Sequence, residues 1–265
     1  MKRVLTALLL IPAVVYIVLF ASAVWFVIST SIVIFLALVE YHGIISGEGN
    51  RSRPIYYAFM GTLAPSIFYF YGIAGMVPFL LIALAMFFVS MFSSKGHFDT
   101  ALREAGLVGI GFLFIAVTVS HLVLIREAGT GWVMFVLVLI WTNDTFAYYG
   151  GRLFGSHKLA PMISPGKTVE GAIAGIVSGI TPAFFLNAGF SLGLGGLEVV
   201  FISIALGIAG IIGDLSESLV KRGAGVKDSG WIMPGHGGLL DRIDSLLFAV
   251  PAFYYYLVWR TGSVL

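Results

Sequence analysis

Long apolar runs separated by short polar stretches extend along almost the whole chain. A helix needs about 20 apolar residues to cross the hydrocarbon core of a bilayer. Nine runs approach this length, and each is predicted to be a helix because backbone N–H and C=O groups cannot remain unpaired in lipid. The predicted helices cover residues 4–20, 23–45, 54–72, 75–92, 105–125, 131–150, 168–188, 197–220 and 239–259.

The composition agrees with this pattern. Of the 265 residues, 59% are hydrophobic and 11% are charged, and the mean hydropathy is +1.01. A soluble domain carries about 25% charged residues. We therefore predict an all-α polytopic membrane protein with nine transmembrane helices. The net charge of +2 gives no reason to expect a nucleic-acid partner.

Positive charge is distributed unevenly across this predicted topology. Thirteen Lys and Arg residues fall on the side of the N-terminus, and two fall on the other side. Cytosolic loops of membrane proteins carry the excess of Lys and Arg, so we expect the N-terminus and the long polar loops to be cytosolic. Lys2 and Arg3 precede the first apolar run as in a signal peptide. No small-residue cleavage pattern ends that run, which favours an uncleaved first span.

A group of carboxylates lies inside the predicted spans, toward their cytosolic ends. An Asp at the centre of a membrane helix costs about 2.5–3.5 kcal/mol to insert, so such residues usually face a cavity and mark function. The alternative is that they form buried ion pairs with neighbouring basic residues. The informative members are Asp144, Glu170, Asp214, Glu217, Asp241 and Asp244.

The spacing of these carboxylates places several of them together. Asp214, Glu217 and Lys221 follow helical periodicity and share one helix face, and so do Asp241 and Asp244. A Gly-rich basic loop, KRGAGVKDSGWIMPGHGG, lies between the two sets. Glycine lets backbone N–H groups approach a phosphate closely. Mg²⁺ binds through one or two carboxylates together with substrate phosphates, so the pattern favours phosphate chemistry with this cation.

A second polar segment, residues 141–171, contains further candidates. Its PMISPGKT stretch narrowly misses a P-loop, because Pro161 stands where the first Gly belongs. Lys167 is expected at a helix start, where anions bind favourably, whereas Lys158 is interpreted as a positive-inside residue. His157 is a loop histidine. Zinc is not expected, since the chain has no Cys and no HExxH pattern.

The residues from Ser218 to Asp244, SLVKRGAGVKDSGWIMPGHGGLLDRID, resemble the signature of the CDP-diglyceride synthetases, or phosphatidate cytidylyltransferases. Every fixed position of that pattern is filled. The stretches that follow Asp144, GRLFGSHKLAP and SPGKTVEG, are also similar to this family. One departure is Gly166, where the family pattern has Lys, so Lys167 is the remaining lysine candidate. The resemblance extends over residues 141–244, and residues 1–140 match only in hydrophobic character.

The resemblance implies transfer of CMP from CTP to phosphatidic acid, with release of pyrophosphate. It implies Mg²⁺ as the cofactor, alone or with a second cation. The implied metal ligands are Asp214, Asp241 and Asp244. Lys221 and Asp144 are further catalytic candidates, and Asp144 and Glu217 rank second as ligands. The implied substrate-binding residues are Lys167, Arg222, Lys227, Asp228, His236, Glu217 and Ser218. His236 lies between two glycines, where loop ordering and substrate contact are both open.

The predicted organisation is one integrated membrane domain. Residues 1–140 are expected to be a scaffold of transmembrane helices, and residues 141–265 are expected to carry the catalytic motifs. The expected location is the bacterial inner membrane, with the active site facing the cytosol. A row formed by Gly171, Gly175 and Gly179 allows close helix packing, either within the chain or in a homodimer.

Two other functions remain open at this point. A CTP-dependent lipid kinase of the polyprenol or dolichol type would transfer the terminal phosphate and release CDP. A cation transporter would use intramembrane carboxylates, but it would tend to place them near the midplane, on broken helices of paired halves. The Asp-Gly-x₂-Ala-Arg pattern of the CDP-alcohol phosphotransferases is absent from the sequence.

Overall fold

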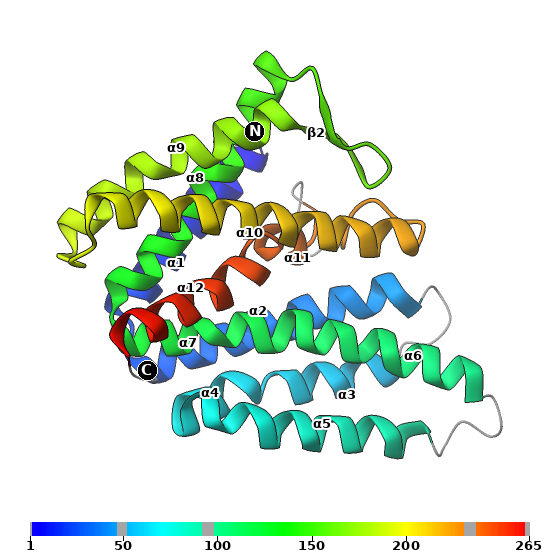
Figure 1. Cartoon of the computed structure of the whole chain (residues 1–265). Coiled ribbons are helices and arrows are strands. Elements are labelled where there is room, and N and C mark those ends of the chain that lie inside the picture. The colour runs from blue at the N-terminus through cyan, green and yellow to red at the C-terminus, as the bar shows by residue number, and fades with distance from the viewer. Residues whose placement is uncertain (1, 47–51, 92–97, 231–236, 263–265) are drawn as a thin grey trace. The chain divides into compact units, whose positions relative to one another are not determined.

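The structure is a computed structural model that describes residues 2–46, 52–91, 98–230 and 237–262. Most of the described chain is helical (Figure 1). The chain divides into two compact units, and each is described by itself. The first contains the described residues up to 124 and those of 228–240, and the second contains residues 125–227 and 241–262.

The first unit is a set of apolar helices. Tyr41 lies in its core, where its hydroxyl donates to the Leu107 carbonyl at 2.9 Å. Its ring occupies the space that a side chain at Gly111 would need, so that glycine permits the close approach of two helices. The elements are α1 (Lys2–Phe20), α2 (Ala23–Ser46), α3 (Ser52–Gly61), α4 (Ala64–Tyr71), η2 (Gly72–Gly75), α5 (Met76–Met91), α6 (Phe98–Gly111) and η3 (Phe112–Val117), with α7 (Thr118–Ala128) running into the second unit.

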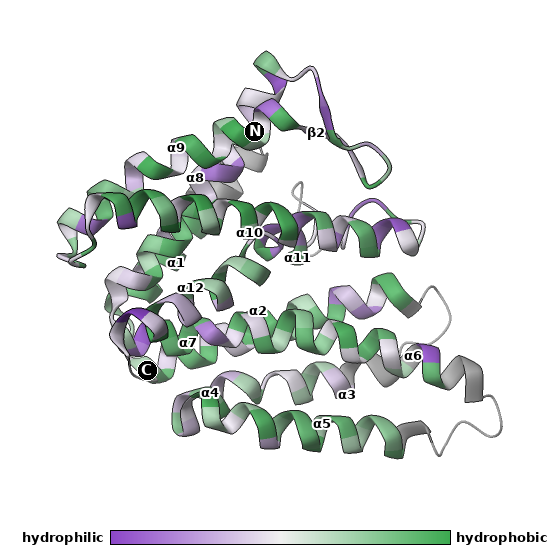
Figure 2. Cartoon of the chain, viewed as in Figure 1, coloured by the Kyte–Doolittle hydropathy of each residue, from purple (hydrophilic) through white to green (hydrophobic). Residues whose placement is uncertain are grey.

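The second unit contains long helices and a short hairpin (Figure 1). Its elements are α8 (Thr130–Phe154), β1 (Lys158–Ala160), β2 (Ser164–Thr168), α9 (Val169–Gly189), α10 (Gly196–Gly223), α11 (Leu240–Ile243) and α12 (Leu246–Thr261). In Figure 2 the hairpin and the C-terminal end of α10 carry much of the hydrophilic colour, while α9 and the rest of α10 are mostly hydrophobic.

The glycine row of α9 packs against α8. A side chain at Gly171 or Gly175 would overlap backbone carbonyls of α8, and one at Gly179 would overlap Asn143. The row therefore serves packing inside the second unit, which confirms the intrachain interpretation of its spacing. Thr168 is the N-cap of α9, and its hydroxyl accepts from the Gly171 N–H at 3.1 Å.

The helical membrane class predicted from the sequence is confirmed. Among the described residues, six helical stretches are long and apolar enough to cross a membrane. They are Ala23–Ile45, Tyr56–Val89, Ala105–Ala128, Thr130–Phe154, Val169–Gly189 and Gly196–Gly223. Helices lie in each of the nine predicted segments, but the predicted spans 54–72 and 75–92 fall in the single stretch Tyr56–Val89. Leu10–Phe20 is a shorter apolar helix, and α12 has 16 residues. Nine crossings and their orientation therefore stay predictions.

The β1–β2 hairpin was not predicted from the sequence. Its strands pair antiparallel, with Lys158 opposite Thr168 and Ala160 opposite Ser164. Pro161 follows the first strand, where the chain turns. Lys167 lies in the second strand, directly before the N-cap of α9, so it is next to the helix start where it was expected.

Candidate active site

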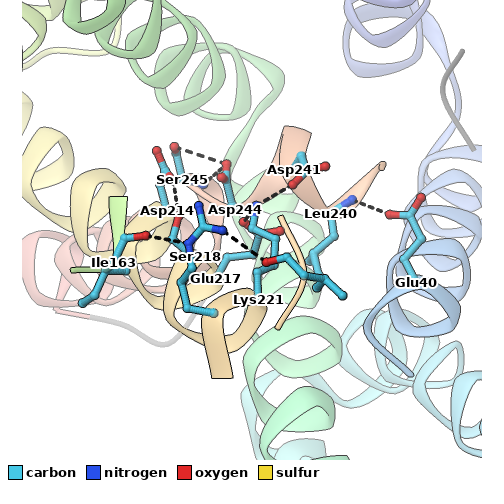
Figure 3. Close-up of polar contacts among 12 residues, drawn as sticks. Glu40, Ile163, Asp214, Glu217, Ser218, Lys221, Leu240, Asp241, Asp244 and Ser245 are labelled. Carbon is cyan, nitrogen blue, oxygen red and sulfur yellow. Dashed lines mark hydrogen bonds and ion pairs between the residues drawn. The ribbon is translucent and has the colours of Figure 1, made fainter. Parts of the chain in front are cut away.

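The C-terminal half of α10 presents acidic and basic groups on one face, as its spacing predicted. Asp214, Glu217 and Lys221 all belong to this helix. Glu217 is almost fully buried, with 1% of its side chain exposed, and it forms an ion pair with Lys221. Ser218 donates to Asp214 at 3.4 Å. A helix that is apolar over most of its length therefore ends in a compact polar cluster (Figure 3).

The predicted helix is interrupted by a turn between α11 and α12, and this turn separates the two carboxylates that were predicted to share a helix face. Asp241 lies in α11, whereas Asp244 and Ser245 form the turn before α12. Asp244 accepts from the Ser245 N–H at 2.7 Å. The Asp244 carbonyl rests against Gly213 of α10, where an added side chain would overlap it.

Three carboxylates come together in the second unit. One oxygen each from Asp214, Glu217 and Asp244 lies within 4.8 Å of the other two. Carboxylate oxygens are the ligands that hard divalent cations such as Mg²⁺ prefer. The donor set therefore fits the cation that the sequence predicted, with Glu217 in the group of three.

Asp241 makes a different contact from its partners in the predicted ligand set. It accepts from the Lys221 Nζ at 2.6 Å. Lys221 thus bridges Asp241 and Glu217, and its side chain is 11% exposed. Two carboxylates around one ammonium group restrict where that lysine can point. A role for Asp241 as a direct metal ligand stays a prediction.

Further polar residues reach the cluster from the helices and hairpin that surround α10. Lys167 of β2 forms an ion pair with Asp214. Asp144 of α8 accepts from the Ser245 hydroxyl at 3.1 Å. Ser245 was missed in the sequence analysis, and its position directly after Asp244 was the available signal. Two elements outside the 218–244 signature, α8 and the hairpin, therefore supply functional candidates, as the similarity over residues 141–171 predicted.

The remaining predicted residues lie outside this cluster. Arg222 donates to the Ile163 carbonyl at 3.1 Å and so holds the hairpin turn beside α10. Lys227 and Asp228 are exposed, and His236 lies outside the described residues. Glu170 pairs with His157, with 2.6 Å between Oε1 and Nδ1, and also accepts from the His157 backbone N–H.

These features define the class of protein as a helical, multi-pass membrane protein with a cluster of carboxylates and lysines suited to phosphate groups. The model of the cytidylyltransferase family matches residues 1–259. The chain belongs to this family, and it is a nucleotidyltransferase.

Relatives with a named activity support this assignment. The phosphatidate cytidylyltransferase of Pseudomonas aeruginosa is 35% identical over 268 residues, which cover 98% of this chain and 97% of that protein. The phosphatidate cytidylyltransferase of Bacillus subtilis is 35% identical over 202 residues, or 74% of each chain. That of Staphylococcus haemolyticus is 41% identical over 161 residues, which cover 59% of this chain and 58% of that protein.

Proposed function

We propose that this chain is a phosphatidate cytidylyltransferase that works by direct displacement at the carboxylate cluster of its second unit. The activity follows from the family and from relatives that match almost the whole chain. CTP and phosphatidic acid are the substrates, and CDP-diacylglycerol and pyrophosphate are the products. The single observation that carries the location of the site is the convergence of Asp214, Glu217 and Asp244.

The reaction requires the two phosphate-bearing substrates to be held together. A phosphate oxygen of phosphatidic acid attacks the α-phosphorus of CTP, and the bond from that phosphorus to the β-phosphate oxygen breaks. Pyrophosphate leaves with the electron pair of the broken bond. The attacking oxygen is already anionic, so no side chain has to act as nucleophile, and positioning with charge neutralisation supplies the catalysis.

The acidic residues suit a divalent cation. Asp214, Glu217 and Asp244 would hold Mg²⁺. Asp144 contacts Ser245, the residue after Asp244, and Asp241 shares Lys221 with Glu217. When bound, this ion supplies positive charge against the phosphates of CTP. A second cation is consistent with the excess of carboxylates over the two lysines in the cluster.

The basic residues have complementary tasks. Lys221, held by Glu217 and Asp241, offsets negative charge on the leaving pyrophosphate or on the lipid phosphate. Lys167, beside Asp214, offers a second ammonium group to the substrates. Such contacts raise turnover only if they are stronger in the transition state than in the ground state.

The active site is expected on the cytosolic side of the bacterial inner membrane. This orientation rests on the uneven distribution of Lys and Arg. It also agrees with the use of CTP, a water-soluble substrate that the enzyme would meet in the cytosol. A homodimer would need a surface other than the glycine row of α9, because that row packs against α8. The mass of the purified protein in detergent would test the oligomeric state.

The location of the site is tested by removing the carboxylates one at a time. D214N, E217Q and D244N should each reduce turnover by more than about a hundredfold, the upper end of the effect of a residue that only supports a metal ligand. EDTA should abolish the activity, and Mg²⁺ should restore it.

The matched control is E198Q, which alters a carboxylate of the same helix. Glu198 pairs with Arg260 at 2.8 Å and lies at the opposite end of α10. The E198Q variant should keep the turnover of the unaltered protein. Full activity in D214N and D244N at saturating Mg²⁺ would refute the proposed site while leaving the family assignment in place.

A further inference from the structure

Glu40 is a buried carboxylate that the mechanism above does not use. It lies in α2, within the apolar stretch Ala23–Ile45, and only 5% of the residue is exposed. A charged or polar group in such surroundings is expensive unless it is hydrogen-bonded. The same insertion cost that singles out the carboxylates of α10 therefore applies to Glu40.

The surroundings of Glu40 come from the signature segment that precedes Asp241. Its Oε2 accepts from the Leu240 N–H at 2.8 Å (Figure 3). A β-carbon added at Gly230 would lie 2.8 Å from the Glu40 Oε1, and one added at Gly238 would lie 2.5 Å from its Oε2. The carboxylate thus lies against the described residues on both sides of the 231–236 stretch.

These contacts act on the part of the chain that leads into the proposed site. Leu240 is joined directly to Asp241, the partner of Lys221, and Asp244 follows in the next turn. The two glycines have an evident purpose, because a side chain at either position would overlap the carboxylate. Glu40 therefore contacts the signature through Leu240 and lies beside both of these glycines.

We propose that Glu40 is a positioning residue for the cytidylyl transfer: by binding the Leu240 N–H and filling the space beside Gly230 and Gly238, it fixes the signature segment that carries Asp241 and Asp244. The proposal rests on the proposed catalytic role of that segment. Glu40 is not required to touch either substrate.

The first test compares three substitutions. E40A removes the acceptor, E40D retracts it by one methylene group, and E40Q keeps an acceptor oxygen at the same reach. E40A and E40D should lower kcat by about tenfold to a hundredfold, as residues that orient ligands do, while the KM for CTP changes little. E40Q should keep most of the turnover. Glu127, an exposed glutamate, provides the control E127A, which should behave as the unaltered protein.

A double-mutant cycle separates positioning from a general effect on folding. The three atoms nearest to a β-carbon added at Gly230 all belong to Glu40, so G230A should impair turnover by displacing the carboxylate. In the E40A background that overlap is gone, and G230A should cost little more. The two losses should be non-additive by more than about threefold.

Each outcome decides the proposal. Additive losses, normal kcat in E40A, or a loss that disappears when activity is expressed per folded protein in detergent would overturn it. If D241N and D244N were fully active, the proposed site would fail. If they were inactive and E40A were normal, only the inference about Glu40 would fail.

Discussion

Replacing Lys221 by Met should destabilise the protein and reduce its turnover together. The substitution keeps a side chain of similar length but removes the ammonium group that Glu217 and Asp241 share. Their side chains are 1% and 13% exposed, so both carboxylates would lose a buried counter-charge. Removing one partner of a buried ion pair costs about 3–5 kcal/mol. Because Lys221 and Asp241 keep partial exposure, we adopt the low end, about 3 kcal/mol.

This magnitude sets measurable effects. A loss of 3 kcal/mol should lower the midpoint of thermal unfolding in detergent by about 6–12 °C. An equal loss in the transition state should reduce turnover by more than about a hundredfold. CTP binding should weaken less than turnover falls, since the lysine is proposed to act mainly on charge that develops during transfer.

Two companion variants isolate the cause. K158M changes a lysine of the hairpin that is exposed, and it should leave stability and turnover unchanged. Adding E217Q to K221M removes one of the two uncompensated carboxylates, so it should recover part of the thermal stability but not the turnover. An unchanged melting midpoint and normal turnover in K221M would refute the reasoning that Lys221 is a buried, catalytically used counter-charge.

Two further predictions concern packing and topology. G213A should lower both stability and turnover, because the added methyl group would overlap the Asp244 carbonyl; overpacking of this kind costs about 1–3 kcal/mol. The control is G223A on the same helix, where an added β-carbon meets nothing within 4 Å, and this variant should be neutral. Equal activity of the two variants would contradict the packing argument. The chain has no natural Cys, so single cysteines at the exposed positions Ser156 and Gly195 can be labelled with an impermeant thiol reagent. Ser156 should react only from the cytosolic side and Gly195 only from the outer side, and labelling of both from one side would exclude the predicted topology.

The sequence predicted the polar face of α10 well because three of its residues follow simple helical periodicity. Asp214, Glu217 and Lys221 indeed belong to one cluster. The same reasoning was less successful for Asp241 and Asp244, because it assumed a continuous helix. The chain turns at Asp244 and Ser245, so one carboxylate joins the group of three and the other binds Lys221.

Other parts of the site depended on tertiary contacts that periodicity cannot reveal. The ion pair between Lys167 and Asp214 requires the β1–β2 hairpin, and only helices were predicted from the sequence for this part of the chain. The role of Ser245 requires knowledge of where Asp144 lies. Glu40 carried a signal in the sequence, a lone carboxylate in a long apolar run, but its partners lie about 200 residues further along the chain.

The most direct test of the account is to follow each phosphate of CTP through the reaction. Purified protein is incubated with phosphatidic acid, Mg²⁺ and CTP labelled at either the α- or the γ-phosphate. The α-label should enter the lipid as CDP-diacylglycerol, the γ-label should appear in pyrophosphate, and labelled pyrophosphate should not exchange into CTP when lipid is omitted. Transfer of the γ-label to lipid with release of CDP would contradict the cytidylyltransferase assignment, and lipid-independent exchange would contradict direct displacement.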